Sequence, residues 1–169
     1  MAVSSLAGRR RFRALLAVTV VLALAALLAG CDGESRDQPA GGTPGEPVTV
    51  TRVIDGDTMV IEGGDRVRYI GIDAPEMPDE QLAGEATEQN RRLVEGRVVW
   101  LEEDVRDRDD YGRLLRYVWV DGTMVNAEMV RLGLAWSRSY PPDTGHQALL
   151  DRMEDEARAK GLGLWASSG

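Results

Sequence analysis

The sequence predicts an α+β, β-rich fold, in which a small five-stranded antiparallel barrel of the Greek-key kind has three α-helices packed outside it. Two observations lead to this prediction. Five short segments have strand character and three have helical character, and they do not alternate in the βαβ order that a doubly wound parallel sheet requires. The chain of 169 residues also has a length that favours one domain.

The five expected strands are short runs, several of them rich in β-branched side chains or alternating between apolar and polar positions. They cover residues 48–53, 58–62, 66–72, 98–101 and 114–120. Residues 63–65, Gly-Gly-Asp, favour a hairpin turn between the second and third strands. Asp121 and Gly122 favour another turn directly after the fifth strand.

The three expected helices cover residues 84–95, 125–132 and 146–160. A glycine follows each of them directly, and glycine commonly ends helices. The last helix carries its apolar side chains on one side, which predicts that it packs against the barrel. We assign the four tryptophans to the core or to the barrel wall; they are Trp100, Trp119, Trp136 and Trp165.

The first thirty residues have the pattern of a targeting segment. Four arginines between residues 9 and 13 precede a sixteen-residue apolar run, residues 14–29. A membrane-spanning helix needs about 20 residues, so the run fits the hydrophobic region of a signal peptide better. It ends in Leu-Ala-Gly-Cys at residues 28–31, which resembles the lipobox of bacterial lipoproteins. We therefore expect residues 1–30 to be a lipoprotein signal peptide and Cys31 to carry the lipid; the alternative is an ordinary cleaved signal followed by an incidental cysteine.

Residues 31–47 hold glycine, proline and polar residues, with no apolar side chain larger than alanine after Cys31. Such a segment cannot bury enough surface to offset its chain entropy, which predicts a disordered tether. The folded domain is then residues 48–169. With lipid chains on Cys31, the protein is expected outside the cytoplasm, held on a membrane as a lipoprotein at the cell surface or the periplasmic face.

Composition excludes several kinds of site. One cysteine and one histidine rule out an internal disulfide, a Cys/His metal cluster and any chemistry that needs paired histidines. The formal charge is −8, and residues 1–30 contain four arginines and no acid, so the chain without them carries 16 basic and 28 acidic residues, a net charge of −12. This balance argues against a generic basic nucleic-acid binder.

Charged residues gather in three segments of the expected barrel, residues 54–58, 68–76 and 110–113. Asp57 and Asp73 have the oxygen ligands that a hard cation such as Ca²⁺ prefers. Arg68 and Arg113 have the planar donors that grip a phosphate, and Glu76 could orient or deprotonate a water molecule. In a continuous strand Arg68 and Asp73 would lie on opposite faces, so we expect a turn at the strand end, near Pro75, to bring the charges together.

Together these segments resemble the thermonuclease family, the micrococcal or staphylococcal nuclease-like enzymes. The resemblance rests on Val-Ile-Asp-Gly-Asp-Thr at 53–58, on the Arg and Ile-Asp-Ala-Pro-Glu of 68–76, on Tyr-Gly-Arg at 111–113, and on the motifs of 121–126 and 129–135. It covers nearly all of the expected domain. It implies an OB-type Greek-key barrel with three helices, and Ca²⁺-dependent hydrolysis of phosphodiester bonds in DNA and RNA that leaves 3′-phosphate ends.

The resemblance also implies a role for each residue of the site. Asp57 and Asp73 correspond to carboxylate ligands of Ca²⁺, and Ala74, where many members have threonine, corresponds to a ligand that acts through its backbone carbonyl. The resemblance implies three catalytic residues, Arg68, Glu76 and Arg113. The two arginines stabilise charge on the phosphoryl oxygens, and Glu76 either positions the attacking water or acts as general base.

Two tyrosines complete the expected substrate-binding site. Tyr111 resembles an aromatic residue beside the 5′ phosphate of the nucleotide. Tyr140 is a candidate platform on which a base stacks, with a half-buried loop tyrosine as the alternative. Asp110 stands where members often carry lysine, which predicts a solvated acidic loop and a weaker grip on a terminal phosphate.

Three hypotheses about function follow. The favoured one is a lipid-anchored, Ca²⁺-dependent nuclease that acts on single-stranded or denatured DNA and RNA, as a monomer with no obligate protein partner. The second is a non-catalytic OB-type module that binds nucleic acid or protein, which has no need of the full catalytic set. The third is a phosphodiesterase for short nucleotides, which an acidic surface would tolerate better.

Overall fold

The computed structural model describes residues 45, 47–76 and 80–166. The expected signal peptide, Cys31 and nearly all of the expected tether lie outside the described residues. In the part of the chain that is described, no helix has the length and apolar character needed to span a membrane.

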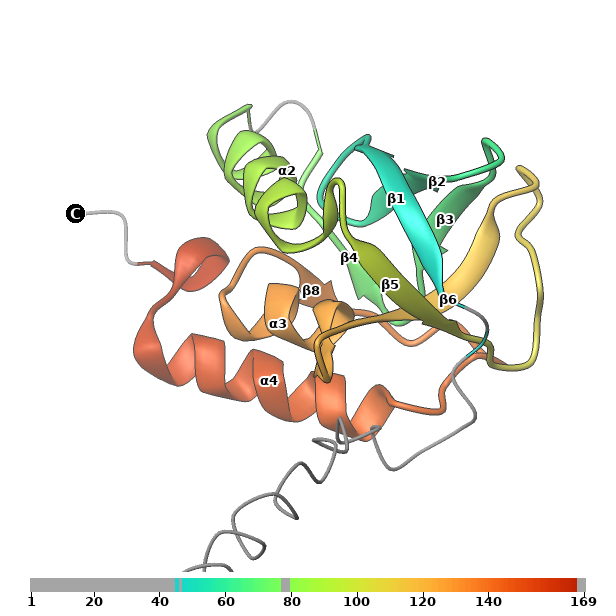
Figure 1. Cartoon of the computed structure of the whole chain (residues 1–169). Coiled ribbons are helices and arrows are strands. Elements are labelled where there is room, and N and C mark those ends of the chain that lie inside the picture. The colour runs from blue at the N-terminus through green and yellow to red at the C-terminus, as the bar shows by residue number, and fades with distance from the viewer. Residues whose placement is uncertain (1–44, 46, 77–79, 167–169) are drawn as a thin grey trace, which may run out of the picture. The chain divides into compact units, whose positions relative to one another are not determined.

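Five strands close into a barrel, as the sequence predicts (Figure 1). They are β1 (Val48–Val53), β2 (Thr58–Ile61), β3 (Arg66–Tyr69), β5 (Val98–Glu102) and β6 (Leu114–Val120). Neighbours pair in the order β3-β2-β1-β5-β6, and β3 pairs with β6 to complete the circle. This last pairing is parallel, so the expectation of a fully antiparallel barrel is wrong for the pair β3 and β6.

The prediction of one continuous strand over residues 66–72 is wrong. The segment divides into β3 and the two-residue strand β4 (Ile72–Asp73), with a turn at Ile70 and Gly71 between them. Gly71 has a φ of 77°, and a Cβ at this position would lie 2.5 Å from a methyl carbon of Leu150. The buried side chain of Asn126 fixes the turn, because its Nδ2 donates to the carbonyl of Ile70 at 2.9 Å. The chain therefore bends well before Pro75.

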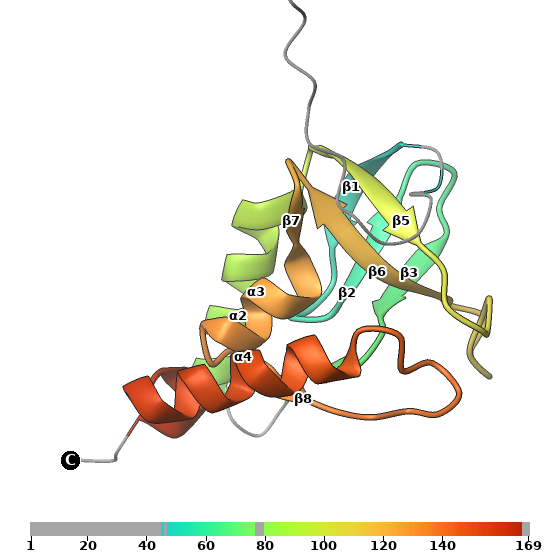
Figure 2. The ribbon, with the colours of Figure 1, turned by 90° about the horizontal axis from the view of Figure 1, so that it is seen from below.

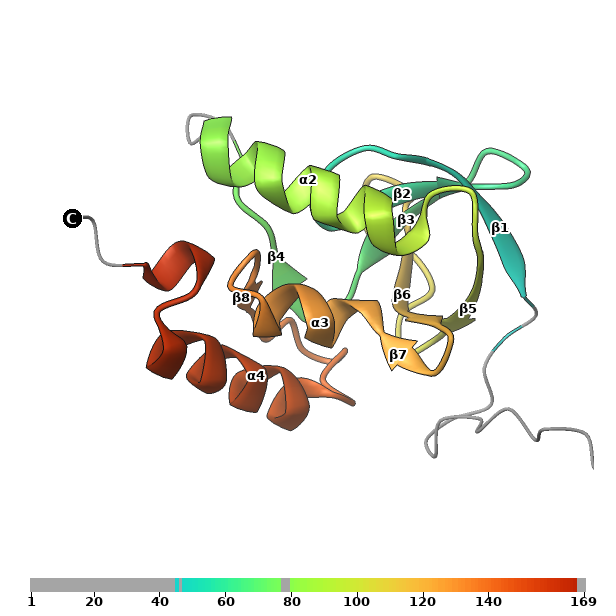
Figure 3. The same cartoon turned by 60° about the vertical axis from the view of Figure 1, so that its left-hand side comes forward.

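Three helices lie on one side of the barrel (Figures 1 and 3). They are α2 (Glu80–Val94), α3 (Val125–Arg131) and α4 (Gln147–Lys160). The sequence predicted the ends of these helices to within one residue, but α2 begins four residues earlier than expected, since its Gly84 lies inside the helix rather than at its start. α4 packs against α3 (Figure 2), and its end is capped by Gly161 in the left-handed conformation.

Three short elements were not predicted. Strand β7 (Thr123–Met124) pairs with β6, strand β8 (Trp136–Ser137) pairs with β4, and η1 (Gly163–Trp165) is a single 3₁₀ turn. Trp100 and Trp119 face each other across β5 and β6, on the barrel wall as expected, whereas Trp136 and Trp165 lie in β8 and η1, outside the barrel strands. All four are half-buried rather than part of the closed core.

The core fills the barrel and the space between the barrel and its helices. Its largest fully buried side chains come from every layer of the fold: Met59, Tyr69, Tyr117, Ile72, Met129 and Leu150. Burial of such side chains is the main stabilising contribution, at roughly 1.5–3 kcal/mol for each large aliphatic one. The β3–β4 turn is thus held between the barrel and α4, and it places Arg68 and Asp73 at a fixed edge of the molecule.

Candidate active site

Arg68 bridges two carboxylates that come from different segments. Its Nη1 lies 3.0 Å from Oδ2 of Asp57, and its Nη2 lies 3.1 Å from Oδ1 of Asp73. The same Nη1 donates to the carbonyls of Tyr69 and Ile72 at 3.1 and 2.9 Å. One guanidinium therefore ties the end of β3 to the start of β4 and gathers the two carboxylates that the sequence analysis singled out.

The two carboxylates differ in their surroundings. Asp57 is buried, with a side chain 9% exposed, whereas the side chain of Asp73 is 40% exposed. Oδ2 of Asp57 also accepts the backbone N–H of Ala74 at 2.7 Å, and Oδ1 accepts the hydroxyl of Thr58 at 3.1 Å. Burial raises the pKa of Asp57 to about 7, against the lowering effects of Arg68 and the Ala74 N–H. An ionised Asp57 thus needs positive charge beside it.

The turn that carries Asp57 approaches its neighbours so closely that only glycine fits at its centre. A Cβ on Gly56 would lie 2.6 Å from the Cβ of Ala74 and 2.8 Å from the Cβ of Ala86 in α2. The buried Asn90 of α2 holds the same turn, since its Nδ2 donates to the carbonyl of Asp55 at 2.9 Å. Its Oδ1 accepts the hydroxyl of Tyr69 at 2.8 Å, which links the turn to β3.

Arg113 is fixed by a single carboxylate in the loop before β6. Oδ1 of Asp109 accepts the backbone N–H groups of Tyr111 and Arg113 at 3.0 and 2.9 Å, and Oδ2 accepts Nε of Arg113 at 2.6 Å. Burial acts to raise the pKa of Asp109, but these hydrogen bonds outweigh it and lower that pKa. The guanidinium of Arg113 lies over the ring of Tyr111, 5.5 Å from its centroid, and among the described residues its two Nη atoms have no hydrogen-bond or ion-pair partner. They are therefore available for a ligand.

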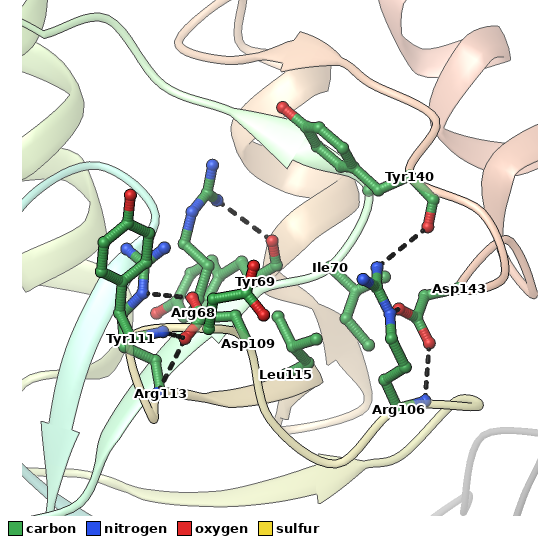
Figure 4. Close-up of a pocket in the computed structure, with 12 residues that line it drawn as sticks. Arg68, Tyr69, Ile70, Arg106, Asp109, Tyr111, Arg113, Leu115, Tyr140 and Asp143 are labelled. Carbon is green, nitrogen blue, oxygen red and sulfur yellow. Dashed lines mark hydrogen bonds and ion pairs between the residues drawn. The ribbon is translucent and has the colours of Figure 1, made fainter.

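Arg68 and Arg113 line one open cavity of about 400 Å³ (Figure 4). Tyr111 and Arg113 lie on one side of it and Tyr140 on the other. Tyr111 is 78% exposed and Tyr140 is 44% exposed, so both rings present free surface to a ligand. Asp110 also lines the cavity and, within the described part of the chain, has no ion-pair or hydrogen-bond partner.

The far wall of the cavity is built on a buried acid that the sequence analysis did not identify. Asp143 is 1% exposed and accepts hydrogen bonds from the backbone N–H groups of Val105 and Arg106 at 3.0 and 2.8 Å. Its other oxygen accepts Nε of Arg106 at 2.5 Å, and Nη2 of Arg106 donates to the carbonyl of Tyr140 at 3.3 Å. This network fixes the segment that carries Tyr140.

Glu76 lies apart from the cavity. It follows β4 by three residues, is exposed, and has no hydrogen-bond or ion-pair partner among the described residues. Pro75 between it and Ala74 is buried, which fixes the backbone where the segment leaves the barrel. The carboxylate of Glu76 is thus free to accept a hydrogen bond from water, on the segment that also carries Asp73.

The donor set fits a hard cation. Asp57 and Asp73 both lie within 3.1 Å of the Arg68 guanidinium, so one positive centre already satisfies both carboxylates. In the described residues no third acid, histidine or cysteine joins them, so further oxygen ligands would have to come from backbone carbonyls and water, which Ca²⁺ accepts. The Ala74 contact that the structure shows is made by its N–H, on Asp57.

With the exception of Glu76, the sequence-predicted residues of the folded domain fall into two groups that share Arg68. Asp57, Arg68, Asp73 and Ala74 lie in direct contact or next to one another in the chain, and Arg68, Arg113, Tyr111 and Tyr140 share the cavity. The supporting residues were missed: Asn90, Asn126, Asp109 and the Arg106–Asp143 pair. Asn126 belongs to the motif at residues 121–126, and Asp109 stands four residues before Arg113. The motif and the short spacing could therefore have indicated these two residues from the sequence.

The closed five-stranded barrel holds an arginine pair, adjacent carboxylates and an aromatic-lined cavity, a set of groups suited to bind a phosphate ester. Residues 66–167 match the model of a family described as staphylococcal nuclease homologue. The thermonuclease of Staphylococcus intermedius is 35% identical over 159 residues, which cover 89% of this chain and 94% of that protein. This chain belongs to the staphylococcal nuclease family, and it is an enzyme of the hydrolase class.

Other relatives support the same assignment. The thermonuclease of Staphylococcus hyicus is 32% identical over 126 residues, which cover 70% of this chain and 75% of that protein. Endonuclease YncB of Bacillus subtilis is 39% identical over 132 residues, which cover 72% of this chain and 63% of that protein. The similarity thus extends over most of the folded domain, including the segments that carry Arg68, Asp73 and Arg113.

Proposed function

We propose that this protein is a Ca²⁺-dependent nuclease that hydrolyses phosphodiester bonds of DNA and RNA and leaves 3′-phosphate ends. The observation that carries the proposal is the placement of two arginines. Arg68 and Arg113 come from segments more than forty residues apart, yet they line one cavity, and two carboxylates lie beside Arg68. A phosphodiester in this cavity would therefore lie near two guanidinium groups.

The two arginines are suited to stabilise a phosphoryl group that gains negative charge during attack. Arg113 keeps its Nε on Asp109, so the two Nη atoms can donate together to two phosphoryl oxygens. Both Nη atoms of Arg68 are bound to carboxylates and carbonyls in this structure. Contact between Arg68 and a phosphate therefore requires some of these hydrogen bonds to break. Preorganised donors of this kind act mainly on the transition state.

Glu76 is the residue that meets the attacking water. Its carboxylate is exposed and unpaired among the described residues, and it follows Asp73 closely in the chain. A carboxylate in this position can accept a proton from water or hold the water in line with phosphorus. The non-catalytic module is disfavoured because a binding surface alone does not require this acid together with Arg68, Arg113 and the two carboxylates.

Asp57 and Asp73 are the residues that would hold Ca²⁺, with the backbone carbonyl of Ala74 and water as further ligands. Bound Ca²⁺ would supply positive charge that polarises the phosphodiester. Asp57 is buried and Asp73 is partly exposed, so the pair offers one fixed ligand and one that can adjust.

We further propose that the enzyme works outside the cytoplasm, as a monomer held to a membrane through lipid on Cys31. The support is the sequence alone: a basic segment and an apolar run that end at the single cysteine of the chain. Mass spectrometry of the membrane fraction tests this directly. The expected result is a chain that begins at Cys31 with lipid attached, and a chain that begins elsewhere or carries no lipid contradicts it.

The enzymatic proposal is tested with the purified full chain on denatured DNA. We expect hydrolysis with Ca²⁺, loss of hydrolysis with a chelator, and products that end in 3′-phosphate. Glu76→Gln and Arg113→Ala should each lower kcat by about a hundredfold or more, as the loss of a catalytic acid–base group or of a preorganised donor does. Wild-type protein that is inert with Ca²⁺, or variants that keep the wild-type rate, would refute the proposal.

A further inference from the structure

The outer face of the first three strands carries a row of side chains that runs across the barrel. Arg52 on β1 is paired with Val60 on β2, and Val60 is paired with Arg66 on β3. Paired residues of neighbouring strands point to the same side of a sheet, and Arg52 and Arg66 are exposed while their chain neighbours Val53 and Val67 are buried. The two arginines therefore face solvent on one side of the sheet, about 10 Å apart because strands are spaced by about 4.8 Å.

These two arginines are unusual in this protein because they lack a carboxylate partner. Most arginines in the described residues form ion pairs with aspartate or glutamate, and four do not: Arg52, Arg66, Arg138 and Arg152. Arg138 is held over the ring of Trp136, and Arg152 lies on α4. In a chain with a formal charge of −8, two unpaired arginines in one row are a local reversal of the overall sign.

The row adjoins the candidate active site. Arg66 and Arg68 are two residues apart on β3, so they lie on the same face about 7 Å from each other. Strand β3 also pairs in parallel with β6, with Val67 beside Leu114 and Arg68 beside Leu115. Continued by one residue, this register brings Arg66 level with Arg113. Arg66 thus stands next to both catalytic arginines, and Arg52 lies two strands beyond it, on β1. Strands β1, β2 and β3 lie side by side in the barrel (Figure 1).

We propose that this arginine row, Arg52, Val60 and Arg66, binds the backbone of a single-stranded nucleic acid beyond the bond that is cleaved. Arg66 and Arg52 contact successive phosphates as the strand leaves the cavity, and the half-buried Val60 offers an apolar surface between them. The inference rests on the proposed nuclease activity and deepens it, because it makes the substrate a polymer rather than a short nucleotide. Glu62, two residues after Val60, is exposed on the rim of the row and limits its extent.

Salt dependence gives the row a quantitative signature. Each phosphate neutralised on a single strand contributes about −0.7 to the slope of log affinity against log salt concentration. Loss of Arg52 and Arg66 together should therefore reduce the steepness of that slope by about 1.4. Repulsion from the acidic remainder of the surface is common to all variants and does not enter the difference between them.

The test compares Arg52→Gln, Arg66→Gln and the double variant with wild type, with Arg152→Gln as the matched control for loss of one exposed, unpaired arginine. Binding of a long oligothymidylate is measured by fluorescence anisotropy in chelator across a salt series. Hydrolysis is measured with Ca²⁺ on the same oligonucleotide and on a dinucleotide. We expect the row variants to bind the oligonucleotide several-fold more weakly and to raise its KM, with unchanged kinetics on the dinucleotide and no effect of Arg152→Gln.

The outcomes separate this inference from the proposed function. Three results would each contradict the proposed role of the arginine row. They are an equal loss of affinity in the Arg152 variant, an unchanged oligonucleotide affinity in the double variant, and an equal loss of activity on the dinucleotide. The wild-type protein could also hydrolyse neither substrate and yet bind the oligonucleotide in a way that depends on Arg52 and Arg66. That result would contradict the nuclease proposal and support nucleic-acid binding by the arginine row. Thermal unfolding of each variant shows whether a loss of binding comes from a loss of fold.

Discussion

Asp109 holds Arg113 by its side chain and its backbone at once, with Oδ2 accepting Nε at 2.6 Å and Oδ1 accepting the backbone N–H at 2.9 Å. The loop turns sharply at Gly112, whose φ is 76°, so the two residues meet four positions apart without a helix. The acid takes only the inner nitrogen of the guanidinium. It therefore acts as a positioning residue that aims the Nη atoms at the cavity.

Asp109→Asn is expected to lower kcat by a larger factor than it raises KM. The amide oxygen can still accept the backbone N–H groups of Tyr111 and Arg113, but the charged contact to Nε is lost. Misplacement of a catalytic group by about 1 Å can cost about a hundredfold in rate. Steady-state kinetics on one oligonucleotide measure both constants. The control is Asp65→Asn, which removes the Asp65–Arg108 ion pair of the same region and leaves Arg113 in place. Equal kcat values for the two variants would show that Asp109 does not position Arg113.

Gly56→Ala should damage the site and the fold together. Its Cβ would lie 2.6 Å from the Cβ of Ala74 and 2.8 Å from the Cβ of Ala86, so the turn that carries Asp57 must move away from α2. Overpacking of this kind costs about 1–3 kcal/mol of unfolding free energy. Thermal or denaturant unfolding measures the loss, and Ca²⁺ titration measures the effect on Asp57.

The matched control for this variant is Gly84→Ala, inside α2. A Cβ there meets nothing within 4 Å, and alanine is favoured over glycine in a helix by about 1 kcal/mol. Gly84→Ala should therefore stabilise the protein slightly and leave activity unchanged. A Gly56→Ala variant as stable as Gly84→Ala would mean that the turn is not packed against Ala74 and Ala86.

Local patterns in the sequence were sufficient to predict the barrel. Four of the five strands and two of the helices begin and end within one residue of the expected positions, because alternation, β-branched residues and terminal glycines are local signals. The break at Gly71 was missed because its cause is not local. It depends on a hydrogen bond from Asn126 and on the methyl groups of Leu150, far along the chain.

The same distinction holds for the site. The acids and arginines that meet the substrate could be selected because their motifs are characteristic of one family. The residues that hold them in place could not, since Asn90 and Asp143 act on backbone groups 35 or more positions away. Their side chains satisfy buried polar groups, and only the folded structure shows which groups those are.

Asp143 should contribute to stability at neutral pH and lose that contribution in acid. Burial acts to raise the pKa of Asp143, but the hydrogen bonds from Arg106 and Val105 outweigh it and lower that pKa from its ordinary value of 3.8. A lowered pKa means that the ionised form stabilises the fold at pH values above about 4, and that protonation at lower pH removes the effect.

Asp143→Asn keeps an acceptor for the backbone but removes the charge opposite Arg106. We expect a loss of about 1–2 kcal/mol at pH 7, since hydrogen bonds to charged groups are worth about that much and Arg106 is partly exposed. The difference in unfolding free energy between wild type and variant should shrink as the pH falls below 4. A difference that stays constant between pH 7 and pH 3 would contradict the lowered pKa.

Asp110 is expected to disfavour substrates that carry a terminal phosphate in the cavity. The three arginines that line the cavity each have a carboxylate partner, whereas Asp110 is an exposed acid without one among the described residues. Asp110→Asn should therefore lower KM several-fold for short oligonucleotides with a 5′ phosphate, and less for those with a 5′ hydroxyl. Asp155→Asn, an exposed acid on α4, is the control for net charge. If both variants change the two KM values in the same ratio, the effect belongs to the overall charge and not to the cavity.

The overall charge should give hydrolysis of long DNA an optimum at intermediate salt. If the first thirty residues are removed, the chain carries a net charge of −12 and repels a polyanion from a distance, and salt screens that repulsion over a Debye length of about 10 Å at 0.1 M. More salt then weakens the direct contacts of arginine with phosphate, so the rate falls again. Initial rates at fixed Ca²⁺ across a salt series should rise and then fall for long denatured DNA. A dinucleotide, with little charge to repel, should show no rising part. A rate on long DNA that falls steadily from the lowest salt concentration would mean that the positive charges around Arg66 and Arg113, rather than the acidic surface, control the approach of the substrate.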